Sequence, residues 1–217
     1  MEIILQSAGK RFNRNWIFRN LNYHFHSSKK YAIIGPNGSG KSTLLQILAG
    51  SMNLSEGSVS YQKSKIENQK LEIGNRKSEI QSENIYKHIS LTAPYLEVIE
   101  EMTAIEFLQF HASFKSFISS VNINKIIEII GLKNSAHQQI RFYSSGMKQR
   151  VKIAQAIFSD VLVLLLDEPC TNLDEAGYNL YYDLINTYCK NKLIIVSSND
   201  VNEYNFCEEK LNITDYK

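Results

Sequence analysis

The sequence predicts an α/β fold with a mostly parallel sheet, an antiparallel β subdomain at its edge and a helical insert subdomain. Three near-continuous apolar runs, at residues 31–34, 161–166 and 193–196, are typical of strands that are buried on both faces. Segments with helical spacing lie between these runs, and strands that alternate with helices favour a parallel sheet. Residues 57–91 are very polar and alternate weakly, which favours exposed antiparallel strands.

The elements follow in order along the chain. Residues 1–30 contain short apolar stretches that suit antiparallel strands, and the strand at 31–34 ends at Gly35-Pro36. A helix from Ser42 to Ala49 carries its apolar residues on one side and is closed by Gly50. Further helices are predicted over 103–114, over 124–130, from 144 to 157 and around 178–189.

The composition is that of an ordinary globular protein, with 43% hydrophobic and 21% charged residues among 217. The length predicts one domain over 1–217, with antiparallel strands from about 1–30 and 57–91 and a helical insert from about 95–150. The net charge is only +2, which gives no reason to expect a nucleic-acid partner. No apolar run is long enough to span a bilayer and no signal peptide is evident, so a cytosolic protein is expected.

Cysteines and histidines predict no metal or disulfide chemistry. The three cysteines are too few and too scattered for a disulfide framework, and Cys170 is expected to be a small space-filling residue. The five histidines show no convincing ligand spacing; they are His24, His26, His88, His111 and His137.

A phosphate-binding loop follows the first apolar strand. The string Gly35-Pro36-Asn37-Gly38-Ser39-Gly40-Lys41-Ser42 matches G-x-x-x-x-G-K-[ST], with a predicted strand before it and a helix after it. Its glycines let backbone N–H groups point inward around an anion, and the helix adds the positive end of its dipole. Lys41 is placed to reach the β- and γ-phosphates, Ser42 to coordinate Mg²⁺ and Thr43 to donate to the α-phosphate. A nucleoside-triphosphate site in a P-loop NTPase core is therefore predicted.

Two carboxylates, Asp167 and Glu168, follow the apolar run 161–166. Ligands of open α/β sheets bind at the carboxyl ends of the strands, so both side chains are expected at the nucleotide. Asp167 is the expected partner of Mg²⁺, and Glu168 is placed to polarise a water for attack on the γ-phosphate.

The stretch Tyr143-Ser144-Ser145-Gly146-Met147-Lys148-Gln149-Arg150 precedes the acidic strand by one helix length. Together with the phosphate loop and the acidic pair, it resembles the ATP-binding subunit of ATP-binding-cassette (ABC) transporters, and the resemblance extends over essentially the whole chain. Thr171-Asn172-Leu173-Asp174 is similar to the family's D-loop. The signature departs from the usual LSGGQ but keeps Ser144 and Gly146, and it is more similar to exporter-type cassettes than to importers.

The resemblance implies a head-to-tail dimer, in which the signature residues Ser144, Ser145, Gly146 and Met147 of one subunit close over ATP held by the other. Ser144 is also suited to cap the helix that it precedes. An aromatic residue upstream of the phosphate loop stacks on adenine in this family. Phe12 has the matching position, and Trp16 is the alternative; either could instead be a packed aromatic at a sheet edge.

Two residues that the family normally has are missing. The lid loop usually begins with a glutamine, but Leu91-Thr92-Ala93-Pro94-Tyr95-Leu96 has none. The histidine that usually contacts the γ-phosphate is replaced by Asn199, whose amide can donate to an oxygen but cannot titrate. Hydrolysis that is slow and little affected by pH near 6.5 is therefore predicted.

The resemblance implies an ATPase, with ATP and Mg²⁺ as ligands, that drives a separately encoded integral-membrane permease. Its partners are then the permease and a second ABC ATPase subunit, identical or different, and its location is the cytoplasmic face of the cell membrane. Two alternatives remain open: a soluble ABC ATPase outside transport, and a P-loop scaffold that binds nucleotide and hydrolyses little.

Overall fold

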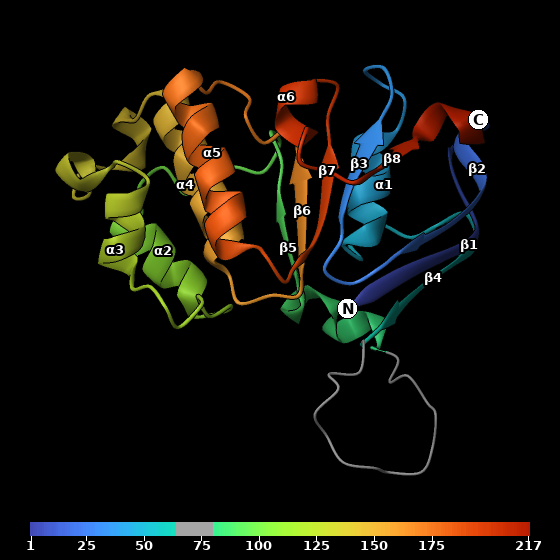
Figure 1. Cartoon of the computed structure of the whole chain (residues 1–217), viewed down its shortest axis with the longest axis horizontal. Helices are drawn as coiled ribbons and strands as arrows, with labels where there is room; N and C mark the ends of the chain where they lie inside the picture. The colour runs from blue at the N-terminus through green and yellow to red at the C-terminus, as the bar shows by residue number, and fades with distance from the viewer. Residues whose placement is uncertain (64–79) are drawn as a thin grey trace, which may run out of the picture.

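The computed structural model describes residues 1–63 and 80–217. A five-stranded sheet forms the centre of the molecule, with the strand order β5-β6-β7-β3-β8 (Figure 1). Every neighbouring pair in this sheet is parallel. Its strands are β3 (Lys30–Ile34), β5 (Ile89–Thr92), β6 (Val163–Asp167), β7 (Leu193–Ser197) and β8 (Glu209–Asn212).

A three-stranded antiparallel sheet with the order β2-β1-β4 lies beside the central sheet. Its strands are β1 (Glu2–Phe12), β2 (Asn15–Phe25) and β4 (Glu56–Gln62). In the register, Ile3 lies opposite Phe25 on one side and opposite Tyr61 on the other. All three side chains are buried, so this face of the sheet packs inward.

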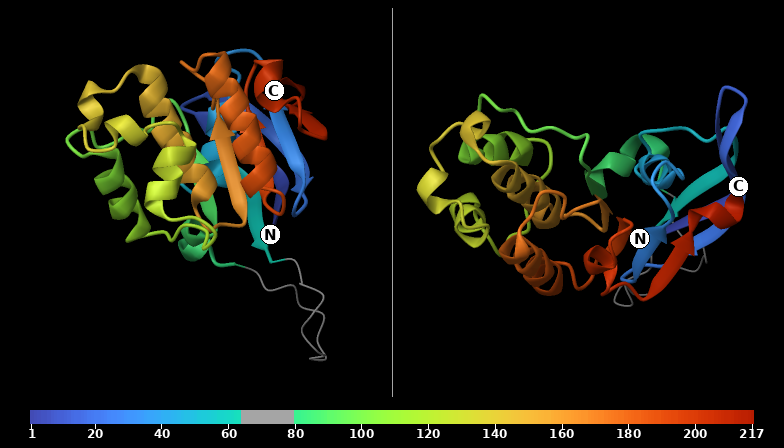
Figure 2. Two further views of the ribbon diagram at one scale, coloured as in Figure 1. Left: turned by 60° about the vertical axis from the view of Figure 1, so that its left-hand side comes forward. Right: turned by 90° about the horizontal axis from the view of Figure 1, so that it is seen from above.

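The helices form two groups. Helix α1 directly follows β3, whereas α2, α3, α4 and α5 gather on the other side of the central sheet (Figures 1 and 2). Their bounds are α1 (Lys41–Leu48), α2 (Ala104–Ala112), α3 (Ile123–Ile129), α4 (Ser145–Phe158), α5 (Glu175–Tyr188) and α6 (Val201–Tyr204). Short 3₁₀ helices are η1 (Ser82–Lys87), η2 (Lys133–Ser135), η3 (Ile140–Phe142) and η4 (Ile213–Tyr216). None of the helices in the described residues combines the length and the apolar character that a membrane span requires.

The central strands separate two hydrophobic cores, because successive side chains of a strand point to opposite faces. Leu164 and Leu166 of β6 pack into the core with α2 to α5, while Val163 and Leu165 pack into the core with α1 and the antiparallel sheet. All four are fully buried. This two-sided burial explains why the strands appear in sequence as unbroken apolar runs.

One segment departs from the predicted organisation. Residues 57–91 were expected to form the antiparallel edge, but Ile89–Thr92 pairs parallel with β6 and belongs to the central sheet. Ile89 and Ser90 are buried, so a polar-looking sequence conceals a core strand. Residues 82–87 form η1 and not a strand. The prediction for residues 64–79 falls outside the described residues.

Candidate nucleotide site

The phosphate loop joins β3 to α1 and turns on residues with positive φ. Gly38 and Gly40 have φ of 75° and 109°, a region that residues with a side chain rarely adopt. A Cβ at Gly40 would lie 2.2 Å from the Ile17 Cγ2 atom, so glycine is required there for space as well. The Ser39 amide donates to the Pro36 carbonyl over 3.1 Å and closes the turn.

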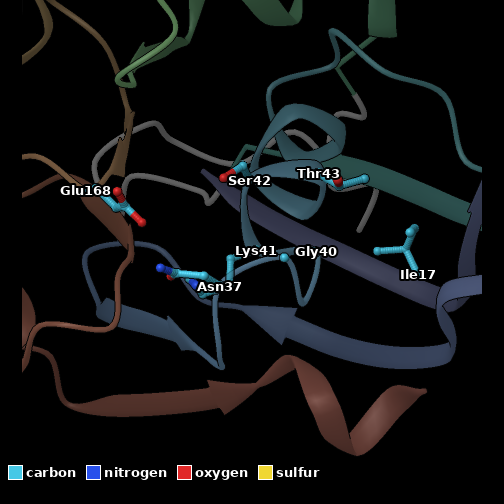
Figure 3. Close-up of a pocket in the computed structure, with 8 residues that line it drawn as sticks. Ile17, Asn37, Gly40, Lys41, Ser42, Thr43 and Glu168 are labelled. Carbon is cyan, nitrogen blue, oxygen red and sulfur yellow. The ribbon is translucent and has the colours of Figure 1, made fainter.

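A pocket of about 240 Å³ opens at this loop. Figure 3 shows Ser42 and Glu168 on one side of it and Thr43 on the side of Ile17. The lining residues are Ile17, Asn37, Gly38, Gly40, Lys41, Ser42, Thr43 and Glu168. The two sequence-predicted elements, the phosphate loop and the acidic pair, are thus brought to one place.

Lys41 lies folded over the loop, where its Nζ donates to the carbonyls of Gly35 at 2.9 Å and Pro36 at 3.3 Å. Burial lowers the pKa of the Lys41 ammonium, and the carboxylates of Glu168 and Asp167 oppose that shift. The pocket therefore holds a buried cation beside two anions. Within the described residues the Lys41 hydrogen bonds go to neutral carbonyls, so the ammonium can exchange them for stronger bonds to an anionic ligand.

Asp167 is the last residue of β6 and is 2% exposed. Its Oδ1 accepts a hydrogen bond of 2.7 Å from the Ser197 hydroxyl at the end of neighbouring β7. Its Oδ2 is buried and has no hydrogen-bond partner among the residues that the structure describes. A buried carboxylate oxygen without a partner is costly, and a hard divalent cation is the kind of ligand that satisfies it. The residues present therefore fit Mg²⁺.

Glu168 follows with a left-handed φ of 42°, which is uncommon for a residue with a side chain. Its amide donates to the Ser197 carbonyl over 2.9 Å, and its carbonyl accepts from the Thr171 hydroxyl at 2.9 Å. These bonds fix the backbone on both sides of the residue. The strained turn aims the carboxylate into the pocket (Figure 3).

Asn199 reaches the same site from the loop that follows β7. Its side-chain amide donates to the Oδ1 atom of Asn37, a lining residue of the phosphate loop. Asn199, which is predicted to contact the γ-phosphate, therefore contacts the phosphate loop directly. Both amides are exposed at the mouth of the site.

Phe12 does not line the pocket. It ends β1, is 46% exposed, and has the Lys10 ammonium 5.1 Å from its ring centroid. Trp16 contacts the guanidinium groups of Arg11 and Arg19 and does not line the pocket either. The apolar lining residue is Ile17 of β2, which no motif predicts, because it reaches the site only through the packing of β2 against the phosphate loop at Gly40. Stacking of Phe12 on adenine stays a prediction.

The lid loop lacks its glutamine, but it places Tyr95 near the acidic pair. The Gln46 side chain, one turn beyond Ser42 on α1, lies near the Tyr95 hydroxyl. Burial raises the pKa of Tyr95, the nearby Gln46 side chain lowers it, and the charge of Asp167 raises it further. No sequence signal identifies Gln46, because its role depends on which face of α1 meets the lid loop.

The predicted signature residues form a second pocket, of about 480 Å³. Ser144 caps α4, since its hydroxyl accepts from the Met147 amide at 3.3 Å. Asn172 lies close by, with its carbonyl 3.1 Å from the position of a Cβ on Gly146. The residues that line it are Gly131, Leu132, Asn134, Ser135, Ser144, Ser145, Gly146, Met147, Arg150, Asn172 and Asp174. This pocket and the phosphate-loop pocket share no lining residue, so one chain does not bring the two motifs together.

The predicted D-loop residues connect the signature to α5. Asp174 caps α5 by accepting from the Gly177 amide at 2.8 Å, and it pairs with the Arg150 guanidinium at 3.3 Å. The Gly177 amide bond is the main cause of the lowered pKa of Asp174, and the charge of Arg150 adds to it. Leu173 is partly buried against the helical core.

Comparison with known proteins identifies the family of this chain. The family model described as ABC transporter matches residues 18–171. YhcH, an ABC transporter ATP-binding protein of Bacillus subtilis, is 28% identical over 201 residues, 92% of this chain and 62% of YhcH. The lantibiotic transport ATP-binding protein SrtF of Streptococcus pyogenes is 29% identical over 197 residues, 91% of this chain and 79% of SrtF.

Solved structures have the same fold. The dimeric structure of MJ0796, a bacterial ABC transporter cassette, has a TM-score of 0.76 at 22% identity and covers 97% of this chain and 94% of its own. A post-hydrolysis state of MJ0796 bound to ADP and Pi has a TM-score of 0.75 over the same shares. The predicted fold class is confirmed. The chain spans 62% and 61% of the length of YhcH and of a second Bacillus subtilis relative, YxlF.

Proposed function

The chain belongs to the ABC transporter family, and from this membership we propose that it binds and hydrolyses ATP to drive transport through a separately encoded integral-membrane permease. The observation that carries the proposal is the meeting of three charged groups at the phosphate loop: Lys41 and Glu168 line the pocket, and the charges of Glu168 and Asp167 both act on Lys41. Phosphoryl transfer to water uses a cation at the phosphates, a ligand for Mg²⁺ and a group that orients the water. The buried Lys41, the Asp167 oxygen without a partner in the described residues and the Glu168 carboxylate on its strained turn suit these three tasks.

Each residue has a role that follows from its position. Lys41 leaves the Gly35 and Pro36 carbonyls and neutralises the β- and γ-phosphates, while backbone amides of the loop hold their oxygens. Ser42 and the free oxygen of Asp167 hold Mg²⁺. The bound ion neutralises charge that develops on the phosphates. Glu168 orients the attacking water and takes its proton.

We further propose that two cassettes close head to tail, with the signature pocket of one covering the phosphate-loop pocket of the other. The two pockets lie apart within one chain, so a complete site needs a second copy or a related subunit. Ser144, Ser145, Gly146 and Met147 lie at the amino end of α4, where the helix dipole attracts the γ-phosphate. The working position that follows is the cytoplasmic face of a membrane, beside the permease.

Asn199 supports slow turnover. An amide bonded to Asn37 can donate to a γ-phosphate oxygen, but it cannot take up or release a proton. This observation favours, as the second candidate function, a cassette that binds ATP and hydrolyses little. A soluble ABC ATPase outside transport is the remaining alternative.

The test is hydrolysis and ATP binding in the variant Glu168→Gln. We expect turnover to fall by about 100-fold or more, as for loss of a general base, with ATP affinity unchanged. Glu175→Gln, an exposed carboxylate on α5, is the matched control and should keep full activity. Unchanged turnover in Glu168→Gln would show that Glu168 is not the base.

Asn199→His tests the slow-turnover proposal. The imidazole restores a titratable donor, so we expect faster hydrolysis that becomes dependent on pH near 6.5. A lower rate contradicts the proposed role of Asn199.

Co-purification with a multi-span membrane protein supports the transport function, whereas ATP binding without phosphate release in the presence of that partner supports the scaffold function.

A further inference from the structure

Three side chains with metal-binding chemistry meet on the outward face of the antiparallel sheet. Ile3 pairs with Phe25 and Ile4 with His24, so the next pair outward in this register joins Glu2 to His26. Side chains two apart on a strand share a face, which places both imidazoles on the same side as the Glu2 carboxylate. The buried Ile3 and Phe25 occupy the opposite face.

The ligand atoms are close to the spacing that a tetrahedral metal requires. One nitrogen from each histidine and one Glu2 oxygen all lie within 4.8 Å of one another. The His24 Nε2 atom is 3.2 Å from Glu2 Oε2, and the two imidazole centroids are 3.8 Å apart. Zinc–nitrogen and zinc–oxygen bonds of about 2.0–2.2 Å place tetrahedral ligands roughly 3.3–3.6 Å apart. Small side-chain rotations would therefore complete the geometry.

We propose that Glu2, His24 and His26 form a binding site for Zn²⁺ or a similar transition-metal cation. Imidazole suits Zn²⁺, Cu²⁺ and Ni²⁺, whereas Mg²⁺ prefers an all-oxygen shell, so the site does not compete for the nucleotide's metal. Two neutral imidazoles and one carboxylate leave one position of a tetrahedral ion for water. His26 is exposed and gives the ion access from solvent.

Charged groups of both signs lie near the cluster. The charge of His26 acts on Glu209, and the Glu209 carboxylate pairs with Lys29 at 2.7 Å. The amino group of Met1 interacts with the Glu2 carboxylate. Within the group of three residues, Glu2 supplies the anionic ligand.

The site is remote from the phosphate loop. His26 precedes β3 and Lys41 follows it, so the two positions lie at opposite ends of one strand of the central sheet. Figure 1 shows the N-terminus at the end of the molecule away from the start of α1. A metal bound there links β1 to β2 and leaves the nucleotide pocket accessible.

The experiment is calorimetric titration of Zn²⁺ into the full chain, prepared without a polyhistidine tag and treated with chelator. We expect one ion per chain and a higher melting temperature with Zn²⁺, reversed by EDTA. His26→Ala and Glu2→Gln should weaken binding by at least the roughly 10–100-fold that loss of an outer-shell partner costs. His137→Ala, an exposed histidine elsewhere, is the control and should bind as the parent does.

His24→Gln is the third variant, and its circular dichroism spectrum shows whether this half-buried position tolerates the change. Co²⁺ gives a second readout, since its visible absorption reports imidazole and carboxylate ligation directly. Failure of the parent to bind one Zn²⁺ overturns the proposal. Equal affinity in His26→Ala, whose exposed side chain poses no folding risk, overturns it as well.

Discussion

At the scale of single residues, His111 is held neutral inside the helical layer. Its Nδ1 atom lies 2.9 Å from the Gln155 amide nitrogen, which can only donate, so Nε2 carries the proton and donates to the Ser159 hydroxyl at 2.9 Å. Burial, with the charge of Lys115 adding to it, lowers the pKa of His111 to about 4. A second proton would break the bond to Gln155.

Glu203 of α6 has a pKa shifted in the opposite direction, and it lies against the turn that follows Glu168. It is 3% exposed, and its Oε1 accepts from the Cys170 amide at 2.7 Å. Burial raises the pKa of Glu203 to about 7, and the nearby carboxylates of Asp200 and Glu168 contribute. The folded protein therefore favours the protonated carboxyl.

The pKa shifts of His111 and Glu203 make stability depend on pH in opposite directions. His111 is neutral in the folded chain, so its contribution is complete above its ordinary pKa near 6.5 and is lost as pH falls toward 4. The contribution of Glu203 is complete below 4.5 and is lost as pH rises through 7. Each amounts to on the order of 3 kcal/mol at full extent, so the two slopes largely cancel between pH 5 and 6.5.

Urea unfolding of single variants, measured between pH 5 and 7.5, separates the contributions of His111 and Glu203. In His111→Gln the free energy of unfolding should fall more steeply as pH rises than it does in the parent, because the slope from Glu203 is no longer opposed by that of His111. In Glu203→Gln it should rise with pH over the lower part of the range. His137→Gln is the control for loss of an exposed histidine and should keep the parent profile. Parent-like profiles in both core variants would contradict the assignment.

At the scale of elements, the antiparallel sheet is tied to α1 by one hydroxyl. Tyr61 of β4 is 3% exposed and donates toward the carbonyls of Ile47 at 3.1 Å and Leu48 at 3.3 Å, at the end of the helix. The last carbonyls of a helix have no partner within the helix itself. The Ile47 carbonyl also accepts from the Gly50 amide at 2.9 Å, and the Tyr61 hydroxyl supplies a donor to the Leu48 carbonyl as well. The contact fixes how the helix after the phosphate loop meets the sheet.

Tyr61→Phe should lower the free energy of unfolding by about 1–3 kcal/mol, because buried carbonyls lose a donor while the apolar packing is kept. Urea denaturation measures the change. Tyr86→Phe removes the hydroxyl of a residue that is 57% exposed and should alter stability by less than about 0.5 kcal/mol. Equal effects of the two substitutions would show that the buried bonds contribute nothing of their own.

At the scale of the whole molecule, the separation of the two pockets gives a direct test of the proposed head-to-tail dimer. Lys41→Ala disables the phosphate loop and leaves the signature intact. Gly146→Asp places a negative charge at the signature, where it repels the γ-phosphate although the first turn of α4 itself favours an acid. Its Cβ would lie 3.1 Å from the Asn172 carbonyl, so circular dichroism must show that the variant is folded. Each variant alone should be inactive.

Mixing the two variants should restore ATP hydrolysis, because a mixed dimer holds one complete site. That site combines the phosphate loop of the Gly146→Asp copy with the signature of the Lys41→Ala copy. Activity is measured against the ratio of the two proteins and should peak near equal amounts. Absence of any recovery, with both variants folded and the parent active, would contradict a homodimer. Restoration should fail when Glu168→Gln is added to the copy with the intact phosphate loop.

The central strands and the nucleotide motifs were predictable from sequence because each depends on local features. A strand buried on both faces must be apolar throughout, and a loop around phosphates must have glycines and a lysine at set spacing. The predicted boundaries are close to those observed: the strand expected at 193–196 runs from Leu193 to Ser197, and the helix expected from Ser144 runs from Ser145 to Phe158.

Features that depend on register or on the packing of distant segments were missed. Ser90 makes β5 look polar, yet the strand pairs with β6 inside the sheet. Ile17 reaches the nucleotide pocket through the packing of β2 against the phosphate loop. The histidine spacing does not indicate the metal site that we propose, because Glu2, its third ligand, lies on another strand.

The sequence alone determined that this chain has a phosphate loop, an acidic pair and a signature in the order of an ABC cassette, since each motif is a contiguous string. The tertiary structure decided which of these motifs meet. It brings Asp167, Glu168 and Asn199 to the loop through neighbouring parallel strands, and it keeps Ser144 and Gly146 in a pocket of their own. The physical reason is that strand pairing joins residues far apart in sequence, so which strands become neighbours depends on the packing of the whole fold.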